Sequence, residues 1–186
     1  MYEKVKRIWS KILAGEAKKP NSFSMRTLSI LGNLSKEEAL LFSKCCSVMI
    51  LNFIPNELDL LNRYGLKYND ILKMDDCGLI NSSGTISARI DISSKNKEIF
   101  YNNDFILLGS CEKNKVLNLS EFIFTASGRE LSTIVCNDSN FNFILDYSKL
   151  IHEENKEISI SLHKVNYIDG NSISYDDDNL LDDYHK

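Results

Sequence analysis

Acidic side chains are the most numerous groups in this sequence that could perform catalysis. Neighbouring carboxylates occur at five places: Glu37 with Glu38, Asp75 with Asp76, Glu153 with Glu154, 176–178, and Asp182 with Asp183. General acid–base catalysis needs two carboxyl groups in different environments, so that one of them keeps its proton near neutral pH. The first pair has the spacing of a helix cap, and the last two groups lie in an acidic tail. No pair therefore has the signature of an acid–base site.

Cysteine and histidine, the other common nucleophiles, bases and metal ligands, are scattered along the chain. The five cysteines form no Cys-x-x-Cys motif, and their odd number favours buried thiols in a reducing compartment. A Cys–His nucleophile would have to combine Cys111 or Cys136 with His152 or His163, and no local motif supports that pairing. The paired ligand spacing of a zinc site is absent. We therefore expect neither a metal nor a catalytic thiol.

Glycine-rich motifs that bind cofactors are also missing from the sequence. The eight glycines occur singly, and the chain contains no phosphate-binding loop, no dinucleotide-binding motif and no nucleophile elbow. We therefore expect a protein that is not an enzyme and that needs no cofactor.

Composition is typical of a folded protein with an uneven charge. Of the 186 residues 43% are hydrophobic, which suits one domain or two small ones. The longest apolar run, 39–54, contains Lys44 and is too short to cross a bilayer, so it predicts a buried helix. No signal-peptide pattern follows Met1, and we expect a cytoplasmic protein without a membrane segment. Residues 1–26 carry seven Lys/Arg against two Glu, and residues 137–186 carry four Lys against eleven acidic residues. Such asymmetry indicates either a partner surface or merely solvated helix faces and a polar terminus.

An amphipathic helix and an elbow are predicted at the start of the chain. An apolar stripe at helical spacing is formed by Val5, Ile8, Trp9, Ile12 and Leu13. Pro20 prevents this helix from continuing, and Ser24 has the properties of an N-cap for the next one. Phe23 and Leu28 then have the spacing of a hydrophobic staple, and Gly32 is expected to end the second helix.

Three further residues complete this elbow. We expect Trp9 to be buried, packed near Phe23, Leu28 and Phe42. Arg26 lies in the first turn of its helix, where a cation opposes the helix dipole, so we expect it to pair with Glu16 across the elbow. The elbow residues are interpreted as a structural signature, and they are Trp9, Glu16, Pro20, Phe23, Ser24 and Arg26.

Helices are predicted to continue through the centre of the chain. Ser35 and Glu38 have the spacing of a capping box, which should open a long central helix over 36–53 that Pro55 ends. A short helix over 56–63, a turn at Tyr64 and Gly65, and a further helix that ends at Gly78 should follow.

Antiparallel strands, two helices and a hairpin are predicted for the remainder. Alternating or apolar segments predict strands at 86–92, 99–108 and 116–124, the second broken at Asn102 and Asn103. Thr125 should cap one helix, and Asp138 or Ser139 should cap another whose inward residues are Phe141, Ile144, Leu145 and Leu150. Asp169 and Gly170 are typical of a hairpin turn.

Residues 56–135 resemble winged-helix domains, in the order helix, turn, helix, Gly-Leu-Ile, strands and then "FTASGREL". The resemblance implies that the helix before Gly-Leu-Ile is the recognition helix, with Lys67, Tyr68, Asn69 and Lys73 as candidate interaction or DNA contacts. This helix has a net charge of −1, because Asp70, Asp75 and Asp76 outnumber the two lysines. Phosphates would be repelled, so we favour protein docking over DNA binding.

The front of the chain resembles a second family more closely. "IWSKILAGEAKKPNSFSMRTLSILGNLSKEEALLFSKCCS" is similar to the pattern of the bacterial domain of unknown function 2806, in which a Trp, "LLAGE", "PGSFS-x-RTL" and "LS-x-x-EA-x-x-F" recur in this order. Asn21 stands where that pattern has Gly. A similar helix and "LS-x-x-EA" segment occur in abortive-infection proteins of phage defence. The resemblance implies a bacterial cytoplasmic protein, no known activity, and a chain that is the C-terminal part of a longer one.

These observations predict an α+β protein with an N-terminal helical layer (1–55), a winged-helix-like centre with an antiparallel sheet (56–136), and a C-terminal helix and β-hairpin with an acidic tail (137–186). Its expected function is that of a non-enzymatic protein-interaction or oligomerisation module, in phage defence or stress. The partner would be another protein or a second copy. The alternative is a winged-helix DNA-binding regulator.

Overall fold

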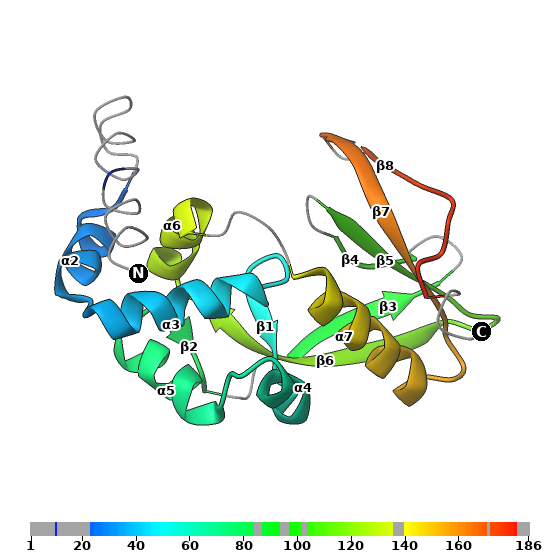
Figure 1. Ribbon diagram of the computed structural model, residues 1–186. Coiled ribbons are helices and arrows are strands. Elements are labelled where there is room, and N and C mark those ends of the chain that lie inside the picture. Colours follow the sequence, from blue (N-terminus) through cyan, green and yellow to red (C-terminus); the bar gives the residue numbers. More distant parts are fainter. Residues whose placement is uncertain are drawn as a thin grey trace. The chain divides into compact units, whose positions relative to one another are not determined.

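The computed structural model describes residue 10 and residues 23–83, 87–93, 97–101, 104–135, 140–170 and 172–181. Within this part the chain is mixed α+β, with six helices and antiparallel sheets, which confirms the predicted fold class (Figure 1). None of the described helices is long and apolar enough to cross a membrane. The predicted first helix, with Trp9, Glu16 and Pro20, lies outside the described residues.

The chain groups into two compact units. Unit 1 comprises Met1–Ile86 and Phe122–Ser139, and unit 2 comprises Ser87–Glu121 and Asn140–Lys186. One boundary between them falls inside strand β6 (Lys115–Phe124). The three-part division expected from the sequence follows chain order rather than packing, and it stays a prediction.

Unit 1 opens with the two helices whose caps the sequence predicts. Helix α2 (Met25–Asn33) begins after Ser24, whose hydroxyl oxygen accepts the N–H of Thr27 at 3.2 Å. Helix α3 (Lys36–Ser47) begins with the predicted capping box, in which the Ser35 hydroxyl accepts the N–H of Glu38 and the Glu38 carboxylate accepts the N–H of Ser35. Gly32 does not end α2 as predicted: it lies inside the helix, which continues for one more residue.

The predicted helix over 36–53 is wrong in its second half, because α3 ends at Ser47. The chain then makes a tight turn in which Ile50 and Phe53 exchange backbone hydrogen bonds of 2.8 and 3.0 Å, with Leu51 at φ 55°. Strand β1 (Phe53–Pro55) follows, so Pro55 ends a strand rather than a helix. A continuous apolar run fits a buried helix and a buried strand equally well, and pairing with β6 decides for the strand.

Two short helices and a strand complete the centre of unit 1. Helix α4 (Leu58–Arg63) is joined by residues 64–67 to α5 (Tyr68–Asp76), and strand β2 (Ile80–Asn81) follows at once. Gly65 and Gly78 both have positive φ, 73° and 72°, and end the two helices where the sequence predicts. Within the sheet the order is β1-β6-β2, with Ile80 opposite Phe124.

The N-terminus of helix α6 (Ala126–Val135) packs directly on the backbone that precedes β2. A Cβ at Gly128 would lie 2.0 Å from the carbonyl oxygen of Leu79. The predicted cap, Thr125, accepts the N–H of Gly128 with its hydroxyl oxygen at 3.0 Å and donates its hydroxyl to the Gly78 carbonyl at 2.7 Å. The Thr125 N–H donates to the Leu79 carbonyl at 3.0 Å. Only glycine fits at position 128, because this contact is made by backbone atoms.

Unit 2 is built on antiparallel strands. Strand β3 (Ser87–Ile92) pairs with the first half of β6. A second sheet has the order β4-β5-β7-β8, formed by β4 (Glu98–Tyr101), β5 (Phe105–Ser110), β7 (Ser159–Asp169) and β8 (Ser172–Tyr175). The predicted hairpin turn at Asp169 and Gly170 is confirmed, with Gly170 at φ 56°. The predicted break at Asn102 and Asn103 lies outside the described residues.

Helix α7 (Phe141–Glu154) packs on this second sheet through aromatic side chains. The ring of Phe100 on β4 stacks on Tyr147 with centroids 6.1 Å apart, and Phe143 stacks on Tyr147 at 6.5 Å. The predicted cap is corrected, because Asn140 rather than Asp138 or Ser139 accepts the N–H of Phe143. Phe141 is 38% exposed and not inward as predicted, since a helix that starts at residue 141 turns Phe143 to the core instead.

We expect Gly128→Ala to destabilise the protein by about 3 kcal/mol, because the new methyl group would overlap a backbone oxygen that cannot move alone. The matched control is Gly32→Ala, which adds the same methyl group inside α2 where no atom lies within 4 Å. The control should be neutral or stabilising by up to about 1 kcal/mol. Urea denaturation of both variants measures the difference, and equal midpoints would contradict the role of Gly128.

Burial raises the pKa of the Glu121 carboxyl group to about 7 from a usual value of 4.5. Between these two values the unfolded chain is ionised while the folded chain retains the proton, so raising the pH lowers the free energy of unfolding. Over this window the wild type should lose roughly 2–3 kcal/mol relative to Glu121→Gln, which cannot ionise. Denaturation midpoints from pH 4 to 8 measure it, and parallel curves for the two proteins would exclude the effect.

Candidate functional site

The four candidate contact residues lie together at and along the start of α5. Lys67 precedes the helix, Tyr68 and Asn69 occupy its first turn, and Lys73 follows one turn later, all of them exposed. The exposed side of α5 also includes Leu72 and Asp76, while Ile71 and Met74 on the opposite side are fully buried. We call the exposed set the α5 stripe, and its members are Lys67, Tyr68, Asn69, Leu72, Lys73 and Asp76. Their role in binding stays a prediction.

Leu72 is the apolar member of the stripe that was not among the predicted contacts. Tyr68 is 44% exposed and Leu72 is 36% exposed, one helical turn apart. The spacing of four residues was the available signal, because it places both on one helix face. Tyr68 also packs against the ring of Phe122, with centroids 6.2 Å apart, so part of its ring is held while the rest faces outward.

Two of the three carboxylates on α5 are used by the fold itself. Asp70 accepts the backbone N–H of Lys67 at 2.9 Å and so caps the start of the helix. Asp75 accepts the N–H of Ser82 at 2.9 Å and also the hydroxyl group of Ser82. The α5 stripe itself therefore carries two lysines against Asp76, although the helix as a whole has the negative charge counted from the sequence.

The turn between α4 and α5 is held from α3. Lys44, the one charged residue in the long apolar run, donates from its ammonium group to the Gly65 carbonyl. Leu66, two residues before α5 begins, is fully buried. Residues 64–67 link the two helices, and these contacts fix where the α5 stripe begins.

The elbow residues that the structure describes have structural roles of different kinds. Ser24 caps α2 as predicted, and its own N–H donates to the Glu130 carboxylate on α6 at 2.8 Å. Phe23 is half-buried, and Arg26 is exposed on α2. The predicted pairing of Arg26 with Glu16 and the burial of Trp9 lie outside the described residues. The contact between Ser24 and Glu130 was missed, since 106 residues separate them.

Glu130 is thereby set as an acceptor for the start of α2. The Ser24 backbone N–H, and then the Thr27 hydroxyl group, hold the pKa of the Glu130 carboxyl below its usual value. Ser24 belongs to the segment "NSFSMRTL", and Glu130 belongs to "FTASGREL". Two of the motifs recognised in the sequence are therefore in direct contact.

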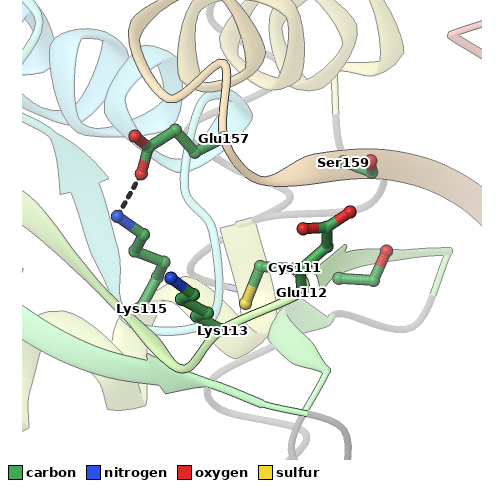
Figure 2. A pocket seen from close by; sticks show the side chains of 7 residues that line it. Cys111, Glu112, Lys113, Lys115, Glu157 and Ser159 are labelled. Atoms are coloured by element: carbon green, nitrogen blue, oxygen red, sulfur yellow. Dashed lines mark ion pairs between the residues drawn. The ribbon is translucent and has the colours of Figure 1, made fainter.

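A cavity of about 690 Å³ lies in unit 2, beside the turn between β5 and β6 and the start of β7. Figure 2 shows the residues that line it, Ser110, Cys111, Glu112, Lys113, Lys115, Glu157 and Ser159. Lys115 and Glu157 form an ion pair, and the hydrogen bond that Lys115 donates to the Glu157 carboxylate raises the pKa of Lys115. The Cys111 thiol faces the Ile92 carbonyl at 3.5 Å. The lining combines balanced charges with two hydroxyl groups, and no pair within it has the geometry of a nucleophile and its base.

Two cysteines and one histidine elsewhere in the described residues are removed from water or held by hydrogen bonds. Burial raises the pKa of Cys45 to about 12 and that of Cys77 to about 11, so both thiols are protonated at neutral pH. His163 is buried and contacts the Asp176 carbonyl through Nδ1 at 2.9 Å and the Ser161 hydroxyl through Nε2 at 2.8 Å. No group of three His, Cys, Asp or Glu residues in the described part could hold a metal ion.

Glu130→Ala should release the start of α2, because the Ser24 N–H loses its acceptor. The expected result is faster hydrogen exchange at the Ser24 amide, measured by NMR. Glu130→Gln is the matched control, since its side-chain oxygen can still accept this hydrogen bond. Equal exchange rates in the wild type and in Glu130→Ala would contradict the assigned contact.

Comparison with known proteins gives one match. A family model described as "Protein of unknown function (DUF2806)" matches residues 1–63 and 53–148. A search of curated proteins found no match, and a search of solved structures found none either. The two matched segments cover most of the chain and include the α5 stripe, the elbow and the Ser24–Glu130 contact. The chain therefore belongs to the DUF2806 family.

Proposed function

We propose that this chain is a non-enzymatic protein-interaction module of a bacterial cytoplasmic protein, and that its partner binds the α5 stripe. The observation that carries the proposal is the pair of exposed apolar side chains, Tyr68 and Leu72, one turn apart on α5. Lys67 and Lys73 lie beside this pair. A partner of matching chemistry is an amphipathic helix with apolar residues at the same spacing and acidic residues beside them.

The electrostatics support docking of a protein rather than DNA. DNA affinity depends on several Lys or Arg side chains that neutralise phosphates. Residues 57–76, from the end of β1 to the end of α5, hold three basic and five acidic residues. The carboxylates are distributed over α4 and α5, so they would repel the phosphates of a DNA duplex. An acidic partner helix is smaller and would place its carboxylates beside the two lysines of the stripe.

The alternative function is DNA binding by a winged helix, and one observation favours it. Helix α3, strand β1, helices α4 and α5, strand β2 and, after β3, β4 and β5, the end of β6 occur in the order of a winged-helix domain, with α5 as the recognition helix. Lys67, Tyr68, Asn69 and Lys73 would then contact DNA. The family resemblance adds phage defence or stress as the proposed context for either function.

Binding to mixed-sequence duplex DNA at low salt separates the two functions. We expect no binding tighter than micromolar for the wild type, and no difference between it and the double variant Lys67→Ala, Lys73→Ala. The matched control replaces two exposed lysines elsewhere, Lys36 and Lys156, by Ala. Tight binding that only the first pair abolishes, and that weakens steeply with salt, would establish the alternative instead.

A photo-crosslinking amino acid at position 68, in bacteria that express the protein, tests docking directly. A discrete protein adduct is expected there, and Leu72→Asp should abolish it because a charge enters the apolar contact. The same amino acid at Ser29, exposed on α2, is the control and should give no such adduct. Adducts of equal yield at both positions, or adducts to DNA, would contradict docking at the stripe.

A further inference from the structure

The hairpin formed by β7 and β8 extends beyond the sheet that carries it. Pairing between β5 and β7 runs from Ser159 to Lys164, whereas pairing between β7 and β8 runs from Val165 to Asp169. The far part of β7 therefore has a neighbour on one side only among the described residues. A two-stranded ribbon is marginally stable in water unless another strand or element joins it.

Apolar side chains lie on one face of this ribbon. Ile168 is paired with Ile173, so their side chains point to the same face, and Tyr175 shares that face because it is two residues further along β8. Ile168 is 38% exposed and Tyr175 is 37% exposed. Tyr175 is held in place by the ring of His163, whose centroid lies 5.1 Å away.

The outer edge of β8 is open among the described residues. Strand β8 is the last in its sheet, and its sequence Ser-Ile-Ser-Tyr has no charge and no proline. Charges, prolines and covering loops are the devices that normally protect such an edge. Residues 176–181 do not fold over this edge, because Asp176 and Leu180 donate backbone hydrogen bonds to Lys164 and Leu162 of β7.

Backbone alternation identifies the groups that this edge offers. The Asp176 N–H points toward β7, where it donates to the Lys164 carbonyl at 2.9 Å. Backbone groups of successive strand residues point to opposite sides, so those of Tyr175 and Ile173 point away from β7. These two residues are therefore available to pair with another strand.

We propose that two copies of this chain associate through β8, antiparallel, about a twofold axis at Ser174. In this register Ile173 of each copy is opposite Tyr175 of the other, and the two residues exchange both backbone hydrogen bonds. The same pairing joins the apolar faces of the two hairpins, and isoleucine opposite tyrosine is a favourable cross-strand pair. An identical strand provides hydrogen-bond partners for the outward backbone groups of both copies at once, as a closed twofold interface requires.

Charge is consistent with this register, although the region is acidic. Asp176 of one copy lies opposite Ser172 of the other, and Asp169, which pairs with Ser172 within its own hairpin, lies one strand further away. Among residues 172–176 no acidic residue is directly opposite another, so a second copy fits without the like-charge opposition that destabilises strand pairs.

Disulfide trapping tests the axis at Ser174. In the proposed dimer the two Ser174 Cα atoms form a non-hydrogen-bonded pair about 4.5 Å apart, within disulfide range. Ser174→Cys should therefore give a covalent dimer under mild oxidation. Ser172→Cys is the matched control on the same strand, because its two copies would be about 13 Å apart. The wild type gives the background from the five natural cysteines. Equal cross-linking of the two variants would overturn the proposal.

Sedimentation provides a second readout that needs no cysteine. The wild type should dimerise with rising concentration within roughly 1 µM to 1 mM, as expected for a small interface. Ser174→Lys and Ser174→Glu should each sediment as monomers, because like charges would face each other, and their equimolar mixture should dimerise again. A wild type that stays monomeric throughout would overturn the proposal. A dimer that survives Ser174→Lys but is lost in Leu72→Asp would also overturn it, and would place self-association at the α5 stripe.

Discussion

The contact of α6 with the backbone of Gly78 and Leu79 is the constraint on which unit 1 depends. Gly128 lets the helix approach the Leu79 carbonyl, where any other side chain would overlap it. Thr125 makes three hydrogen bonds at the same place. Its hydroxyl group donates to the Gly78 carbonyl, its N–H donates to the Leu79 carbonyl, and its hydroxyl oxygen accepts the Gly128 N–H. Because Gly78 also ends α5, this contact fixes the end of the helix that carries the exposed stripe. The beginning of α6 and the end of α5 are thus set by one group of backbone atoms.

From this junction a second contact reaches the N-terminal elbow. Glu130 lies two residues beyond Gly128 on α6 and accepts the N–H of Ser24. The motifs around Ser24, Gly78 and Gly128 are therefore linked into one packed arrangement, although they are far apart in the chain. Their occurrence in the sequence is explained by helix starts, helix ends and close backbone approach, and none of them requires a chemical reaction. This is why the proposed function rests on an exposed surface.

Hydrogen bonds also change how the charges of α5 are interpreted. Asp70 and Asp75 count toward a negative helix, yet each is held as an acceptor of backbone N–H groups. What remains on the exposed side is the apolar pair of Tyr68 and Leu72, with two lysines, one amide and one carboxylate beside it. Under the proposed function, this surface binds a protein helix rather than the dense phosphates of DNA. The β8 edge in unit 2 is a different kind of surface, offering backbone groups rather than side chains, so one chain can contact a partner and a second copy separately.

Helix caps and turns could be predicted from the sequence, whereas contacts between distant segments could not. The caps at Ser24, Ser35 and Thr125 and the turns at Gly65, Gly78 and Gly170 follow from interactions within a few residues, so their residue types suffice. The apolar pattern of residues 116–124 predicted a strand there as well. The apolar run before Pro55 became a strand because β6 is there to pair with it. Asn140 began α7 in place of Asp138 or Ser139, and this turned Phe141 outward. Neither Glu130 as the acceptor for Ser24 nor the exposure of Leu72 could be read locally, because each depends on which distant surface lies against the helix. The sequence alone determined the mixed α+β class and the caps and turns that act locally, whereas only the tertiary structure decided which apolar segment became a strand, which faces are buried and which remain available for binding, since burial is a property of neighbours brought together by folding.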